Sequence, residues 1–237
     1  MIDGISSYAV GDFIPFVDEV YYRLFERQFE AWWPVHLLLL ASGVIALAFA
    51  CMGKNRIVAV LLGFLLLVCS VTFHFRLYAE LTPVGSIFGW AFLVQIPLVL
   101  AWGFMTKFHQ SFRPDFPTIA GAAIAMFGLA VYPLLAFATE RSGLGAAEYL
   151  GMAPDPTVCF IMGILLMSAR SYWFLLLFPI PLLWSATTGA TLNALDAPLP
   201  MTLPVLAAVA LSTSIYKAVL RKSPGSPGGE QSACPIG

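Results

Sequence analysis

The chain has 237 residues, of which 59% are hydrophobic and 11% are charged, and its mean hydropathy is +0.85. This composition leaves too little polar surface for a soluble globular protein and indicates a polytopic membrane protein. The formal net charge is −1 without a strongly basic cluster, so no nucleic-acid partner is expected. The four cysteines lie far apart and form no Cys-x-x-Cys pair, which argues against a disulfide framework or a thiolate zinc site.

The first predicted element is an amphipathic helix over residues 12–31, preceded by a short polar arm. Charged residues recur at helical spacing on one side and aromatic or aliphatic residues on the other, up to Trp32-Trp33-Pro34. This pattern is typical of a helix that lies in the membrane interface with an aromatic anchor. It fits equally well a helix whose apolar face only packs on the rest of the protein.

Seven apolar runs follow, and we predict that each forms a transmembrane helix. They cover residues 33–53, 57–79, 84–106, 117–139, 157–169, 171–192 and 198–219. Merging the fifth and sixth runs into one helix would place Arg170 in the middle of the bilayer at a cost of roughly 3 kcal/mol or more, so a turn is expected there. The sequence thus predicts an all-α membrane protein: residues 1–32 as arm and interfacial helix, 33–220 as a seven-helix bundle, and 221–237 as a disordered cytoplasmic tail.

Lysine and arginine residues are distributed unevenly between the two predicted sides of the membrane. The N-terminus and the connections after the second, fourth and sixth runs hold four of the twelve, and the other side holds eight. The positive-inside rule therefore predicts a bacterial inner-membrane topology with the N-terminus outside and the C-terminus in the cytoplasm. Eleven of the thirteen acidic residues lie on the outer side, which favours cations near that face.

The fifth apolar run, residues 157–169, is too short to cross a bilayer. At ~1.5 Å per residue it reaches roughly 20 Å of a ~30 Å hydrocarbon core. Residues 145–156 are therefore expected to dip in from the outer side, where irregular backbone must be covered by protein or line a wet cavity. Asp155 is predicted to cap this helix, with Pro156 at its first position, by analogy with the half-helices that hold anionic groups in secondary transporters.

Polar residues at the depth of this helix start define a candidate vestibule in the outer third of the bundle. Ionisable groups inside spans are functional candidates, because their burial is costly without partners or water. The predicted lining consists of His36, His74, Arg76, Glu80, Glu148, Asp155, Thr188 and Thr191.

Each of these residues also has a simpler interpretation. Arg76 and Glu80 are four residues apart and can pair with each other, and Asp155 can act as a helix cap alone. His36 and His74 can each bond a neighbouring carbonyl, and they are weak candidates for a metal site because no ligand spacing requires one. Gln95 is expected to make an interhelical hydrogen bond. Close helix packing is expected at Gly63, Gly85, Gly89 and Gly163.

Enzymatic motifs are missing from the sequence. It contains no Gly-x-Ser-x-Gly, no His-Glu-x-x-His and no phosphate-binding glycine loop. We therefore expect a protein that is not an enzyme, and the residues indicate no particular cofactor.

Several sequence blocks are distinctive. They are Tyr132-Pro133-Leu134-Leu135, Ala147 to Thr157 (AEYLGMAPDPT), Phe178 to Trp184 (FPIPLLW), Thr188 to Leu192 (TGATL), and near the start Asp12-Phe13, Tyr21 to Glu26 (YYRLFE) and Trp33-Pro34. Over nearly the whole chain up to about Leu220, they resemble an uncharacterised family of bacterial multi-pass membrane proteins, domain of unknown function family 6064. The resemblance implies a bacterial inner-membrane protein with a shared topology and carries no activity. The chain departs from it at Gln28-Phe29-Glu30, where an asparagine is expected.

Two function classes fit these observations. A carrier or channel for a small solute or cation is slightly favoured, because it explains the short fifth run, the prolines in the sixth run and the acidic outer face. A non-catalytic accessory or scaffold subunit of a larger membrane complex is the alternative, because the spans hold few polar groups. Expected partners are the lipid bilayer and other membrane subunits or a second copy of the chain.

Overall fold

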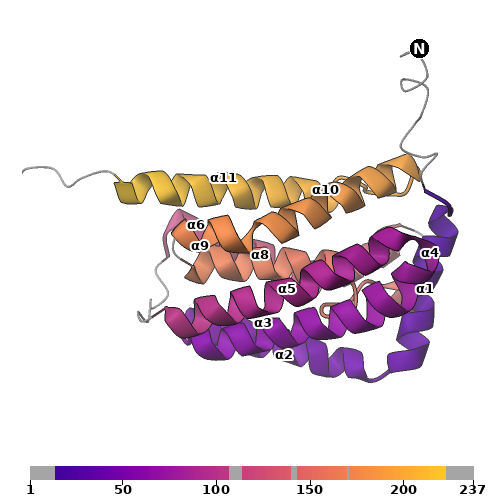
Figure 1. The fold of residues 1–237 in the computed structure, drawn as a ribbon, viewed down its shortest axis with the longest axis horizontal. Helices are drawn as coiled ribbons and strands as arrows, with labels where there is room; N and C mark the ends of the chain where they lie inside the picture. The colour runs from indigo at the N-terminus through magenta and orange to yellow at the C-terminus, as the bar shows by residue number, and fades with distance from the viewer. Residues whose placement is uncertain (1–13, 107–113, 140–142, 170, 223–237) are drawn as a thin grey trace, which may run out of the picture.

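The computed structural model describes residues 14–106, 114–139, 143–169 and 171–222, and within these ranges all extended regular elements are helices. The long helices lie side by side with alternating direction, and the first helix crosses one end of this bundle (Figure 1). We call that end, which also holds the start of α8, the α1 end.

The helices follow the predicted apolar runs. Their bounds are α1 Asp18–Trp32, α2 Val35–Cys51, α3 Asn55–Cys69 with the π-helix η2 Ser70–Tyr78 and α4 Ala79–Leu81, α5 Pro83–Met105, α6 Phe116–Met126 with the π-helix η3 Phe127–Val131 and α7 Tyr132–Ala138, the 3-10 turn η4 Gly143–Ala146, α8 Pro154–Ser168, α9 Ser171–Leu177, α10 Pro179–Ala194 and α11 Thr202–Lys222. The all-helical prediction is therefore confirmed for the described residues. The predicted tail beyond Lys222 and the arm before Ile14 lie outside them.

Four continuous helical rods are long and apolar enough to cross a membrane. They are Asn55–Leu81, Pro83–Met105, Phe116–Ala138 and Thr202–Val219, and the pair α1 and α2, bent by 97°, would count as a fifth if it were one span. The helix α8 is shorter, and the rod formed by α9 and α10 is interrupted at Phe178. Length and composition thus support four to five spans and leave the predicted seven unconfirmed.

The first helix begins at Asp18 and not at residue 12 as predicted. Pro15 disfavours helical backbone at Ile14, and Phe16 is instead buried against the rings of Tyr21 and Tyr78. The apolar face of α1 packs on the bundle: the Phe25 ring stacks on Phe73 of η2 at a centroid distance of 5.4 Å. The structure therefore shows that the apolar face of this helix packs on the bundle, while its place at a membrane interface stays a prediction.

The helix α8 is the centre of the fold. All its residues from Pro154 to Ser168 are buried, and it contacts α2, α3, α6, α10 and α11. At its C-terminal end, the Lys217 ammonium group of α11 donates a hydrogen bond of 2.5 Å to the Leu166 carbonyl and lies 5.7 Å from the Phe174 ring centroid. A positive charge at this end is stabilised by the helix dipole.

The backbones of α6 and α8 touch each other, which requires small residues. A methyl group at Gly163 would lie 2.4 Å from the Ala125 nitrogen and 2.5 Å from the Gly121 carbonyl oxygen. A methyl group at Gly128 of η3 would lie 2.7 Å from the Pro156 carbonyl oxygen. Such close approaches through small residues are typical of helix packing in membranes. The predicted packing role of Gly163 is confirmed.

The break between α9 and α10 follows from two prolines. Pro181 has no N–H group to bond the Leu177 carbonyl four residues earlier. The Gln95 side chain of α5 fills that place and donates a hydrogen bond of 2.8 Å to this carbonyl. The predicted interhelical hydrogen bond of Gln95 is confirmed, and it stabilises the irregular point of the rod.

Candidate functional site

Asp155 is the hub of a buried polar cluster near the α1 end of the bundle. Its carboxylate accepts hydrogen bonds from the Tyr132 hydroxyl of α7 (2.9 Å), the Trp184 indole N–H of α10 (2.7 Å) and the Thr188 hydroxyl of α10 (3.2 Å). The side chain is 1% exposed. Trp184 and Thr188 are four residues apart and therefore project from one face of α10. Three uncharged donors from two neighbouring helices thus hold one carboxylate inside the bundle.

Asp155 is not the helix cap that the sequence predicts. The helix α8 begins at Pro154, its N-cap residue is Ala153, and no side chain caps it. Pro154 suits the first helical position, so the helix starts before Asp155, which lies in the first turn and not at the cap position. The carboxylate turns instead toward α7 and α10.

Thr157 connects the helix to the segment that covers its start. The threonine hydroxyl accepts a hydrogen bond from the Gly151 N–H (2.7 Å) and donates one to the Ala153 carbonyl (2.6 Å). Thr157 is fully buried, and so is the preceding segment from Ala146 to Ala153. This irregular backbone is covered by protein, which is one of the two environments in which such backbone is tolerated at membrane depth.

Glu148 is a second buried acid in this region. Its side chain is 5% exposed, and its carboxyl group is close enough to that of Asp155 for the two to interact electrostatically. Both groups also act on Tyr21 of α1: burial raises the pKa of this phenol well above its ordinary value, and the two carboxyl groups add to the rise. Tyr21 is therefore a neutral neighbour of the Glu148 and Asp155 carboxyl groups.

His74 is enclosed by aromatic rings. Its centroid lies 4.5 Å from that of Phe92 and 5.0 Å from that of Trp184, and its side chain is fully buried. Neither ring nitrogen has a hydrogen-bond partner among the described residues. His74 lies in the π-helix η2, a type of helical turn that is frequent at functional sites. The prediction that His74 faces the interior is met, and Trp184 links it to Asp155.

His36 belongs to a different cluster. It is 2% exposed, and its ring lies 5.1 Å from Phe29 and 5.0 Å from Tyr149. Among the described side chains it shares no aromatic neighbour with His74, so the structure does not bring the two histidines together. Across the parts of the chain that the structure describes, no group of three or more His, Cys, Asp or Glu side chains is arranged to hold a metal ion.

Arg76 and Glu80 lie on the exposed surface of the α1 end. The Glu80 carboxylate pairs with Arg27 of α1 at 3.7 Å, and the Arg76 guanidinium lies 5.6 Å from the ring centroid of Trp32. The suggested pairing of Arg76 with Glu80 is therefore replaced by two contacts to α1. Both residues attach α1 to the bundle from outside and do not line an interior space.

Gln28 is a residue whose role the sequence did not indicate. It is 2% exposed, and its amide donates hydrogen bonds to the Thr72 hydroxyl (3.0 Å) and the Met152 carbonyl (3.2 Å). It thus ties α1 to both η2 and the segment that covers α8. Its only sequence signal is a polar side chain on the apolar face of α1, at the position where the resemblance predicts an asparagine.

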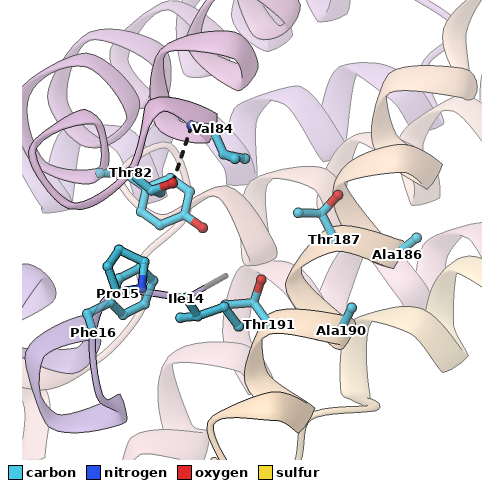
Figure 2. Close-up of a pocket in the computed structure, with 10 residues that line it drawn as sticks. Ile14, Pro15, Phe16, Thr82, Val84, Ala186, Thr187, Ala190 and Thr191 are labelled. Carbon is cyan, nitrogen blue, oxygen red and sulfur yellow. Dashed lines mark hydrogen bonds between the residues drawn. The ribbon is translucent and has the colours of Figure 1, made fainter. Parts of the chain in front are cut away.

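An open cavity of about 390 Å³ lies at the α1 end. Figure 2 shows Thr82 and Val84 on one wall, Ala186, Thr187, Ala190 and Thr191 of α10 on the other, and Ile14 to Phe16 at the side. Tyr78 also lines the cavity. The Tyr78 ring centroid lies 6.0 Å from that of Trp184, so this cavity approaches the Asp155 cluster.

The predicted vestibule residues therefore do not all lie together. Asp155 and Thr188 are in direct contact, Glu148 and His74 lie beside them, Thr191 lines the open cavity, and the remaining three lie elsewhere: His36, Arg76 and Glu80. Trp184 and Tyr78 complete the arrangement without having been predicted. Trp184 could have been found from its spacing of four residues to Thr188.

The family comparison gives one match. A family model described as "Family of unknown function (DUF6064)" matches residues 18–223. No curated protein and no solved structure matches the chain. Since the matched segment spans nearly every described helix, from α1 to the end of α11, the chain belongs to the DUF6064 family.

Proposed function

We propose that this protein is a seven-span protein of the bacterial inner membrane that binds a small solute at its outer end and acts as a carrier. The single observation that supports this most is the buried carboxylate of Asp155, held inside an apolar bundle with Glu148 beside it. Such groups are costly inside a membrane and are characteristic of ion and proton sites in transporters. In the proposed mechanism, Asp155 is the group that a proton or another small cation neutralises.

The seven-span topology is supported by helix direction and by the charge of the first helix. Successive rods from α2 to α11 alternate in direction, with α9 and α10 forming one rod (Figure 1). The helix α1 is too charged to be a span, because it carries six charged residues: Asp18, Glu19, Arg23, Glu26, Arg27 and Glu30. This charge favours a position across the outer end of the bundle, with α2 as the first span.

The proposed topology makes a direct labelling prediction. A cysteine placed at Glu19, on the exposed face of α1, is expected to react with a membrane-impermeant maleimide in intact spheroplasts, whereas a tag at Gly237 stays inaccessible. Cys51 is an internal control, because it is exposed at the opposite end of the bundle and is expected to react only after permeabilisation. Labelling of Cys51 in intact spheroplasts would indicate the opposite orientation in the membrane.

The interior below Asp155 favours a carrier over an open channel. From Val158 to Met167 the side chains of α8 are apolar and buried, so they provide no polar passage along the centre of the bundle. A transported solute would therefore need a second conformation, as in alternating access.

Transport is tested with purified protein in liposomes on a solid-supported membrane. The concentration of sodium, potassium or methylammonium ions is raised abruptly, and the wild type is expected to give a current with at least one of these ions. Asp155→Asn is expected to reduce it about tenfold or more, since it removes the intramembrane charge. Glu80→Gln is the matched control, because this acid is exposed, and its current stays unchanged. Currents no larger than those of protein-free liposomes would count against the carrier.

The second candidate is a non-catalytic accessory subunit of a membrane complex. It is favoured by the closed centre of α8 and by the apolar outer faces of the bundle, for example Val205, Val209 and Ile215 on α11. These faces fit lipid, another membrane subunit or a second copy of the chain. A detergent-solubilised native particle of defined larger mass, together with absent currents, would support this candidate. In both cases we propose a protein without enzymatic activity and without a nucleic-acid partner.

A further inference from the structure

The described lining of the open cavity at the α1 end carries no charged residue. It consists of Ile14, Pro15, Phe16, Tyr78, Thr82, Val84, Ala186, Thr187, Ala190 and Thr191. The cavity volume of about 390 Å³ is within the range of small-molecule sites, which are mostly apolar with a few polar groups that orient the ligand. Burial of an unpaired ion against this lining would be costly, so the cavity suits an uncharged molecule.

Two hydroxyl groups on opposite walls have complementary capacities. The Thr187 hydroxyl donates its hydrogen to the Leu183 carbonyl at 2.9 Å, which leaves its oxygen able to accept. The Thr82 oxygen accepts from the Val84 N–H at 3.5 Å, which leaves its hydrogen able to donate. Both side chains line the same space (Figure 2). Together they offer one donor and one acceptor.

Tyr78 also lines the cavity, and its ring packs against Phe16 and Trp184. The hydroxyl groups of Tyr78 and Thr191 add to those of Thr82 and Thr187, and the rest of the lining is aliphatic or aromatic. The cavity therefore offers a few hydroxyl groups within an otherwise apolar lining.

We propose that this cavity binds an uncharged amphiphile, an alkyl or aromatic body that carries a hydroxyl group. The ligand hydroxyl donates to the Thr187 oxygen, while its apolar body packs on Ala186, Ala190 and Val84. This ligand class deepens the proposed function, because it specifies an uncharged solute that the proton or small cation at Asp155 accompanies, and it rests on that function for its transport role. Both a free alcohol and a hydroxyl-bearing membrane lipid have this chemistry.

Photoaffinity labelling in liposomes tests the proposal. The probes are a diazirine-bearing long-chain alcohol, a diazirine-bearing benzyl alcohol and a diazirine-bearing alkane without a hydroxyl group, with labelled positions mapped by mass spectrometry. The alcohols are expected to label the cavity segment of α10, and the alkane to label it roughly tenfold less, since one hydrogen bond in an apolar site is worth on the order of a factor of ten. Labelling by the long-chain alcohol alone indicates a lipid source, and labelling by both alcohols a free solute.

Matched variants separate recognition from partition into the bilayer. Thr187→Val is expected to reduce alcohol labelling to the alkane level, and Thr213→Val is its control, because Thr213 makes the same bond to a carbonyl four residues earlier on α11, away from the cavity. Ala190→Phe fills the cavity and is expected to abolish labelling, whereas Leu183→Phe, two turns away on the same helix, leaves it unchanged.

Three results would overturn the proposal: equal labelling by alcohols and alkane, labelling unaffected by both cavity variants, or labelling that appears only after removal of residues 1–13, which would make that segment the occupant. The proposal can fail independently of the carrier function. Cation currents that depend on Asp155, together with absent cavity labelling, would refute the ligand class alone. Cavity labelling without such currents would refute the carrier alone.

Discussion

Asp155→Ala is expected to reduce the free energy of unfolding by about 3 kcal/mol or more, because it leaves three buried donors without an acceptor, each worth on the order of 1–3 kcal/mol. These donors are Tyr132, Trp184 and Thr188, which lie on α7 and α10 around the start of α8. The measurement is the thermal unfolding midpoint in detergent, followed by size-exclusion chromatography. A large shift would identify the carboxylate as the group that joins these helices.

Two controls make this result specific. Asp155→Asn is expected to retain most of the stability, because its amide oxygen can accept from Trp184 while its NH₂ group donates to the hydroxyl oxygens of Tyr132 and Thr188. Glu80→Ala removes an acid whose pair with Arg27 is exposed, and is expected to cost at most about 1 kcal/mol. If Asp155→Ala unfolds at the temperature of Glu80→Ala, the cluster does not stabilise the bundle.

Gly163→Ala is expected to reduce the free energy of unfolding by about 2–3 kcal/mol, because overpacking a tight contact costs about this much free energy. The added methyl group would lie 2.4 Å from the Ala125 nitrogen and 2.5 Å from the Gly121 oxygen, both backbone atoms that cannot move without separating α6 from α8. The unfolding midpoint of the purified variant measures the loss.

Gly63→Ala is the matched control for this contact. Its methyl group would lie 3.4 Å from a side-chain methyl group of Ile96, an ordinary contact, and alanine favours helix by up to about 1 kcal/mol over glycine. This variant is therefore expected to be neutral or slightly more stable. Equal losses at both positions would show that helix packing at Gly163 is no tighter than elsewhere.

Part of the candidate site could be predicted from the sequence. The buried position of Asp155, its level near Thr188 and the interior position of His74 followed from the short fifth apolar run and from the rise per residue of a helix. The cap role of Asp155 did not hold, because the helix starts at Pro154 with Ala153 as its N-cap residue, so Asp155 lies in the first turn. Glu80 pairs with Arg27 and not with Arg76, because α1 lies across the end of the bundle. Residue spacing along a single helix does not show such a contact with another helix.

The sequence by itself determined the helical runs, their apolar character and the family, because composition and apolar run length depend on local residues alone. It also predicted the interhelical hydrogen bond of Gln95, a polar residue within an apolar run. Only the tertiary structure decided that α8 is the buried centre and that Trp184 links Asp155 to His74. It also decided that the open cavity is lined by neither Asp155 nor His74. A membrane helix is apolar on all sides, so its periodicity does not show which face meets which neighbour. That choice depends on backbone contact between small residues such as Gly121 and Gly163, and on buried polar groups that find their partners on other helices.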